Sequence, residues 1–103
     1  MIETGLNNKV VIVTGGVAGI GRATALGFAA QNCRVSVWDV SDDGSDRLVE
    51  EIAGAGGEGM FQKVNVADSE AVAAAAAEVA EHWGCIDVLV NNAGIVRDAQ
   101  LIK

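Results

Sequence analysis

The sequence predicts an α/β protein, a doubly wound parallel sheet of which the chain supplies the first four strands. Short apolar segments alternate with longer segments of helical periodicity, an order typical of βαβ units. The first apolar segment, residues 9–14, is a continuous β-branched run that suits a strand buried on both faces. The last apolar segment, residues 86–90, has the same character. These observations together favour a parallel sheet with right-handed crossovers.

The other predicted elements follow in order along the chain. We expect strands over residues 34–39 and 59–66, helices over residues 22–32, 41–53 and 69–83, and a new helix near residue 98. Asn32 and the glycine-rich run at residues 54–57 are the expected stops of the first two helices. Asp68 and Ser69 give an N-cap signal for the third helix, and Gly84 is its expected end.

The fourth predicted strand indicates that the domain is incomplete. A parallel strand as apolar as residues 86–90 normally lies inside a sheet with both faces covered. Residues 95–103 are all that follow the turn at residues 91–94. We therefore expect a long hydrophobic edge to be exposed on this strand.

Composition excludes several classes of function. The chain of 103 residues has a net charge of −7 and a pI near 4.4, which gives no electrostatic support for binding nucleic acid or anionic membranes. No apolar run approaches membrane-spanning length, and no basic segment followed by an apolar one opens the chain. Cys33 and Cys85 form no metal-binding or redox motif. We therefore expect reduced thiols, no metal site and a cytoplasmic protein.

A glycine-rich turn from Thr14 to Gly21 organises the chain. It joins the first strand to the first helix, where free backbone N–H groups and the helix dipole favour a phosphate. Gly15 can adopt the angles of the turn, Gly19 lets the main chain approach a pyrophosphate, and Gly21 lets the helix pack close to the strand. The spacing differs from the usual G-x-G-x-x-G fingerprint, and glycine-rich turns also occur without a ligand. The alternative is therefore a glycine-rich turn that has a purely structural role and binds no ligand.

Polar residues stand at the carboxyl ends of the other predicted strands. Asp39 ends the second strand, where a dinucleotide fold places the acid that hydrogen-bonds the adenosine ribose. A carboxylate there repels a 2′-phosphate and so favours NAD(H) over NADP(H), while the alternative is an aspartate that caps the next turn. Asn65 and Val66 end the third strand, and Asn-Asn-Ala-Gly at residues 91–94 follows the fourth. Because these ends share one sheet edge, we expect a common ligand site, although each amide can also simply close a turn.

Two aromatic side chains complete the candidates. His82, the only histidine, lies at a helix end where a cation would complement the dipole. No carboxylate or nucleophile is paired with it by spacing, so we expect no catalytic role. Trp38, beside Asp39, either helps to wall an adenine site or packs against a helix.

Three motifs together resemble the short-chain dehydrogenase/reductase family, which has a Rossmann-type fold, over essentially the whole chain. They are Thr14-Gly15-x-x-x-Gly19-Ile20-Gly21, Asp39, and Asn91-Asn92-Ala93-Gly94. Residues 92–98 are also similar to the corresponding stretch of 3-oxoacyl-[acyl-carrier-protein] reductases and acetoacetyl-CoA reductases. The resemblance implies an NAD(H)-dependent oxidoreductase whose complete form moves hydride between nicotinamide and a carbonyl or alcohol, 3-oxoacyl thioester reduction being one such reaction.

The resemblance also implies a set of cofactor-binding residues. By this similarity the glycine turn holds the pyrophosphate, Asp39 the adenine ribose, Asn65 and Val66 the adenine, and residues 92–94 the middle of the cofactor. The full set is Gly15, Val17, Ala18, Gly19, Ile20, Gly21, Asp39, Val40, Asn65, Val66, Asn92, Ala93 and Gly94.

Two positions depart from the family pattern. The family usually has aspartate where this chain has Asn65, which removes a charge and keeps a hydrogen-bonding group. Reductases of the acyl-carrier type usually take NADPH, whereas Asp39 points to NADH. The substrate class therefore stays open.

The resemblance also implies a set of catalytic residues, which follow the fourth strand in the family. They are an asparagine on the next helix, a serine on the fifth strand, and a Tyr-x-x-x-Lys pair. In that pair the tyrosine acts as general acid or base. This chain contains no tyrosine. We therefore expect residues 1–103 to be the amino-terminal, dinucleotide-binding part of an enzyme, truncated and inactive alone. As a complete enzyme we expect a homo-oligomer, or a complementing chain that supplies the rest of the sheet. The alternatives are a non-catalytic adenine-nucleotide-binding half-fold and an interaction module that uses the edge of strand 86–90.

Overall fold

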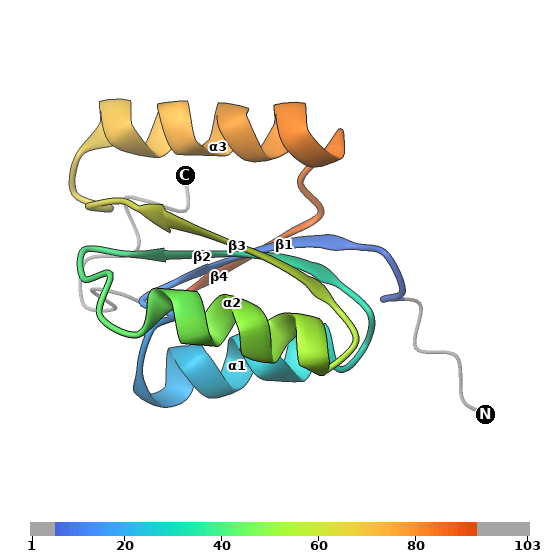
Figure 1. Ribbon diagram of the computed structural model, residues 1–103. Helices are drawn as coiled ribbons and strands as arrows, with labels where there is room; N and C mark the ends of the chain where they lie inside the picture. The colour runs from blue at the N-terminus through green and yellow to red at the C-terminus, as the bar shows by residue number, and fades with distance from the viewer. Residues whose placement is uncertain (1–5, 93–103) are drawn as a thin grey trace.

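The computed structural model describes residues 6–92, and in this part of the chain strands and helices alternate strictly (Figure 1). The elements are β1 (Val10–Thr14), α1 (Gly19–Ala29), β2 (Arg34–Asp39), α2 (Ser45–Gly54), β3 (Glu58–Lys63), α3 (Ser69–Trp83) and β4 (Val88–Asn91). The four strands pair in parallel in the order β3-β2-β1-β4. The predicted doubly wound α/β class is confirmed.

Helices cover both faces of the sheet. Figure 1 shows α1 and α2 on one face and α3 on the other. Successive strand residues point to opposite faces, and β1 accordingly serves two cores. Val11 and Val13 pack with the residues of α1 and α2, whereas Val10 and Ile12 pack with those of α3. The sheet is therefore buried on both sides where it carries the glycine turn.

The helix α1 differs from the prediction at both ends, whereas α3 follows its sequence signals. The helix α1 begins at Gly19, three residues before the predicted start, because the turn is already complete there and the Arg22 N–H donates to the Ala18 carbonyl at 3.3 Å. The helix ends at Ala29, three residues before the predicted end, and Asn32 lies beyond it with a left-handed φ of 65°. Of the two predicted N-cap residues, Asp68 caps α3, since its side chain accepts hydrogen bonds from the N–H groups of residues 70 and 71, and Ser69 is the first residue of the helix.

The start of α2 and the bounds of β3 and β4 differ more from the prediction. The helix α2 begins at Ser45, not at residue 41, because the Asp39 carboxylate and the Ser41 hydroxyl accept N–H groups in the preceding loop. The strand β3 ends at Lys63, and Asn65 closes a turn by accepting the Ala67 N–H at 2.9 Å. The strand β4 begins at residue 88, two residues later than predicted.

Within residues 6–92, β4 is an edge strand and pairs with β1 alone. Leu89 is 47% exposed and the preceding Ile86 is 38% exposed. The predicted hydrophobic edge is therefore present on the described part of the sheet.

Candidate functional site

The turn between β1 and α1 has the backbone that its glycines were expected to allow. Gly15 and Gly19 have φ values of 64° and 61°, in the left-handed region that favours glycine. A Cβ at Gly21 would lie 2.0 Å from the Gly15 carbonyl oxygen, so α1 can approach β1 only because residue 21 has no side chain. Nothing lies within 4 Å of the position that a Cβ would take at Gly19. That side of the turn is open to a ligand.

The start of α1 leaves its first backbone donors without a side-chain cap. Ala18 is the N-cap, has extended backbone angles and makes no capping hydrogen bond. No acidic residue lies in the first turn, and Ile20 is 77% exposed. The positive end of the helix dipole and its N–H groups are therefore accessible, as a phosphate site requires.

Asp39 is tied directly to this turn. Its Oδ2 accepts the Val17 N–H at 3.2 Å, and its Oδ1 accepts the Ser41 N–H at 3.1 Å. The Trp38 carbonyl beside it accepts the Gly15 N–H at 2.7 Å. Asp39 therefore caps the turn that follows it, which was the alternative to a ligand-binding role. It also lies against the glycine turn.

A pocket lies beside Asp39 at the carboxyl edge of the sheet. Its empty volume is about 270 Å³. Its lining consists of Gly15, Trp38, Asp39, Val40, Val64, Asn65 and Val66. Four of the predicted cofactor residues thus lie around this pocket together with Asp39: Gly15, Val40, Asn65 and Val66. Val40 is 60% exposed, and the amide oxygen of Asn65 is engaged by its local turn.

The end of β4 is fastened to the glycine turn by hydrogen bonds. Asn92 donates its Nδ2 hydrogen to the Gly15 carbonyl at 3.3 Å and its backbone N–H to Thr14 Oγ1 at 2.8 Å. The buried Thr14 hydroxyl donates to Asn91 Oδ1 at 3.0 Å. The Asn91 Nδ2 is buried and has no hydrogen-bond partner among residues 6–92. The predicted Ala93 and Gly94 lie outside the described residues.

Sequence analysis missed two contributors to this arrangement. A Cβ at Gly16 would lie 2.6 Å from the Val37 Cγ1, so this glycine too is required by packing. The Thr14 hydroxyl joins β1 to β4, which no spacing in the sequence indicates. Its position as a polar residue at the end of an otherwise apolar strand was the available signal.

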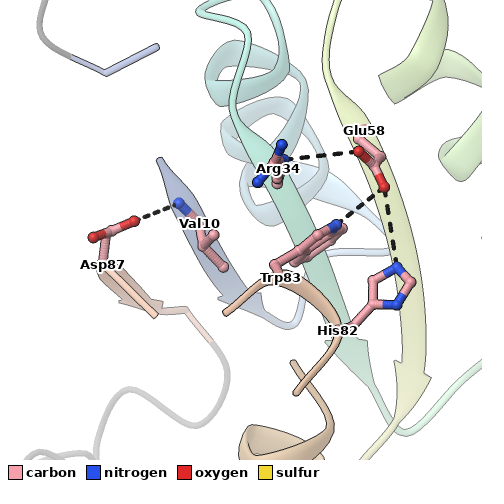
Figure 2. A network of polar contacts seen from close by, with 6 residues as sticks. All are labelled: Val10, Arg34, Glu58, His82, Trp83 and Asp87. Carbon is pink, nitrogen blue, oxygen red and sulfur yellow. Dashed lines mark hydrogen bonds and ion pairs between the residues drawn. The ribbon is translucent and has the colours of Figure 1, made fainter. Parts of the chain in front are cut away.

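His82 lies at the opposite edge of the sheet, where β2 and β3 begin. Figure 2 shows it with Trp83, Glu58 and Arg34. Glu58 Oε2 accepts the Trp83 Nε1–H at 3.0 Å and lies 4.0 Å from His82 Nε2. The Arg34 Nε is 3.8 Å from Glu58 Oε1. His82 therefore belongs to an exposed polar network far along the strands from the glycine turn.

Asp87 lies at the same edge, before β4, and accepts the Val10 N–H at 2.8 Å (Figure 2). This hydrogen bond holds the pKa of the Asp87 carboxyl below its usual value. Cys85 donates its thiol to the same carboxylate at 3.5 Å, and Cys33 is buried. Both cysteines are unpaired. In the described part of the chain, no cluster of three or more potential metal ligands is present, and no helix has the length and apolar character to cross a bilayer.

A glycine turn at a helix N-terminus, an acid at the end of the next parallel strand and a pocket at the same edge are the arrangement typical of Rossmann-type α/β proteins. Residues 9–103 match the family model described as short chain dehydrogenase. This chain belongs to the short-chain dehydrogenase/reductase family.

Curated relatives of the chain include several oxidoreductases. The 3-oxoacyl-[acyl-carrier-protein] reductase of Thermotoga maritima is 42% identical over 98 residues, which cover 95% of this chain and 40% of that protein. The D-threitol dehydrogenase of Mycolicibacterium smegmatis is 39% identical over 92 residues, covering 89% of this chain and 35% of that protein. The chain spans well under half the length of these relatives.

Solved structures give the same result for the fold. A hydroxysteroid dehydrogenase from Escherichia coli superposes with a TM-score of 0.81 and 35% identity, over 86% of this chain and 38% of that one. An NADH-dependent reductase complexed with NAD gives a TM-score of 0.84 and 30% identity, over 90% of this chain and 39% of that one. The described sheet thus corresponds to part of a longer family domain.

Proposed function

We propose that this chain is the NAD(H)-binding portion of a short-chain dehydrogenase/reductase whose complete form moves hydride between nicotinamide and a carbonyl or alcohol substrate. The observation that carries the proposal is the hydrogen bond from the Val17 N–H to the Asp39 carboxylate. It brings the phosphate-binding turn and the ribose-binding acid to one edge of the sheet.

The residues present fit the adenosine diphosphate half of the cofactor. The uncapped start of α1 offers backbone donors for a pyrophosphate, and the missing Cβ at Gly19 leaves room for one. Each oxygen of Asp39 accepts one backbone N–H and keeps a second lone pair for a ribose hydroxyl. The pocket beside Val40 and Val66 offers apolar surface to adenine. When bound, the nicotinamide supplies hydride chemistry, while these residues bind and orient the other end.

Asp39 is the residue that favours NAD(H). A 2′-phosphate would bring further negative charge to a carboxylate in a chain that already carries a net charge of −7. The NADH-dependent relative complexed with NAD supports the same choice. The relatives are named for different substrates: a 3-oxoacyl chain, D-threitol and a hydroxysteroid. We therefore propose the type of reaction and not one substrate. Reduction of a 3-oxoacyl thioester is the particular case that the Thermotoga relative suggests.

We further propose that catalysis and assembly need chain beyond these residues. The sequence has no tyrosine to serve as the family's acid or base. The exposed Leu89 on β4 favours completion of the sheet by further strands, from a longer form of the protein or from a complementing chain. The complete enzyme is proposed to be a cytoplasmic homo-oligomer, and the unpaired cysteines suit a reducing compartment.

Calorimetric titration of the purified chain tests the cofactor assignment. We expect NADH and ADP-ribose to bind, NADPH to bind much more weakly, and the Asp39→Ala variant to lose this discrimination. A folded chain that binds none of the three, or binds NADPH as well as NADH, would contradict the proposal. Dehydrogenase turnover by the pure chain would contradict the assignment of catalysis to residues outside it.

A further inference from the structure

Gln62 on β3 is the centre of a buried polar network on the α3 side of the sheet. The residue is 8% exposed. Its Oε1 accepts the Ser36 hydroxyl at 2.7 Å and the Trp38 Nε1–H at 2.6 Å. Its Nε2 donates to the Ala75 carbonyl at 3.1 Å and to Glu78 Oε1 at 2.8 Å. One amide therefore joins β2 and β3 to α3.

The network uses the full hydrogen-bonding capacity of this side chain. A glutamine amide oxygen accepts two hydrogen bonds and its nitrogen donates two, and all four positions of Gln62 are filled. Ser36 and Trp38 are 0% and 3% exposed, so water cannot readily replace a lost partner. Moving the amide would leave buried donors unpaired, at substantial cost. Gln62 therefore fixes the orientation of the Trp38 indole.

Trp38 connects this network to the candidate nucleotide site. Its carbonyl oxygen accepts the N–H groups of Gly15 at 2.7 Å and Gly16 at 3.4 Å. The next residue, Asp39, accepts the Val17 N–H. Trp38 also lines both the pocket at the sheet edge and a second, apolar hollow of about 490 Å³ between the sheet and α3. The position of Trp38 therefore determines the position of the glycine turn through these backbone hydrogen bonds.

We propose that Gln62 is a positioning residue for nucleotide binding: by fixing Trp38, it holds Asp39 and the glycine turn in the geometry that receives the adenosine diphosphate end. The inference rests on the proposed function above. Gln62 does not line the pocket beside Asp39, so it acts through Trp38 and not by contact with the nucleotide.

A tryptophan signal makes this role measurable. The chain has two tryptophans, and Trp83 lies at the opposite edge of the sheet, so a Trp83→Phe background leaves Trp38 as the only one. In that background, we expect Gln62→Leu to weaken ADP-ribose binding about tenfold, because two buried donors lose their shared acceptor. The change in Trp38 emission on nucleotide binding should shrink in parallel.

A matched control separates positioning from loss of stability. Ile52→Val removes a buried methyl group from the core under α1 and α2, on the other face of the sheet. Urea titration gives the stability of each variant, and calorimetry gives its affinity. We expect Ile52→Val to keep ADP-ribose affinity within about twofold while losing stability. An equal loss of affinity in Ile52→Val and Gln62→Leu would overturn the inference.

The contact with Glu78 provides a rescue experiment that does not depend on the folding of Gln62→Leu. Gln62→Glu places a second carboxylate at the 2.8 Å contact and should weaken ADP-ribose binding about tenfold. Adding Glu78→Gln restores a donor and acceptor pair, and affinity should recover to within about threefold of the background. Unchanged affinity in Gln62→Glu, or no recovery in the double variant, would overturn the positioning role. A wild-type chain that binds no ADP-ribose would overturn the proposed function as well.

Discussion

The main-chain N–H of Val17 donates to Oδ2 of Asp39 at 3.2 Å, although the two residues are 22 positions apart in the sequence. The other carboxylate oxygen accepts the Ser41 N–H. One side chain therefore fixes the glycine turn against the end of β2. The groups proposed to bind the pyrophosphate and the ribose are positioned by a single contact.

The charge of Asp39 should set the preference between the two cofactors. Asp39→Asn keeps the size of the side chain and one acceptor oxygen but removes the charge that repels a 2′-phosphate. We expect the ratio of NADH to NADPH affinity to fall about tenfold, as measured by calorimetry. Asp42→Asn, an exposed acid in the following loop, is the control and should leave the ratio unchanged. A ratio that Asp39→Asn does not alter would refute this role.

Two glycines of α1 should respond in opposite directions to alanine. Gly21→Ala places a Cβ 2.0 Å from the Gly15 carbonyl and should destabilise the chain by about 2–3 kcal/mol or more. Gly27 is an exposed helical residue with nothing within 4 Å of its Cβ position, so Gly27→Ala should stabilise by about 0.5–1 kcal/mol. Urea denaturation measures both. Equal effects of the two substitutions would show that the turn does not need the close approach of α1.

The Thr14 hydroxyl should contribute to stability through the junction of β1 and β4. Thr14→Val keeps the shape but removes the oxygen that accepts the Asn92 N–H and donates to Asn91 Oδ1. We expect a loss of about 1–3 kcal/mol by urea denaturation, because buried polar groups become unpaired. Thr24→Val, at a partly exposed site on α1, should change stability by less than about 0.5 kcal/mol. Similar losses at both positions would contradict the specific role of Thr14.

The contribution of Asp87 should depend on pH. The Val10 N–H lowers the pKa of this carboxyl in the folded chain, so the folded state favours its ionised form. Its contribution is therefore present above the ordinary carboxyl pKa and is lost as the pH falls through the lowered value. Asp87→Asn should be less stable than wild type at pH 7, and the difference should begin to shrink below about pH 4 and vanish only when the pH is below the lowered pKa of the folded state. A difference that persists unchanged at pH 3 would show that the hydrogen bond is not charge-dependent.

The individual residues of the candidate site were more predictable from the sequence than the hydrogen bonds between them. The structural roles of Gly15 and Gly21 were predicted correctly because backbone conformation and close packing leave few alternatives to glycine at such positions. The position of Asp39 on the shared edge was predictable because it ends a strand of a parallel sheet. The contact of Asp39 with Val17 was not predictable, since it depends on how β2 is aligned with β1.

The element boundaries show the same limit. Side chains that bond to nearby backbone groups decided where α2 begins and where β3 ends, and hydrophobic periodicity does not register them. Gln62 reads as one polar residue within a predicted strand. Its four partners come from β2 and α3, and only the folded chain brings them together.

The most direct test of the site is to locate nucleotide binding by NMR on the isotope-labelled chain titrated with ADP-ribose. If the nucleotide binds at the carboxyl edge of the sheet, the backbone amide signals of Val17, Ser41 and Val66 should shift. Those of Glu58 and Cys85, at the opposite edge, should stay in place. Shifts centred on Glu58 and Cys85, or none at saturating ADP-ribose, would contradict the assignment of this edge as the nucleotide site.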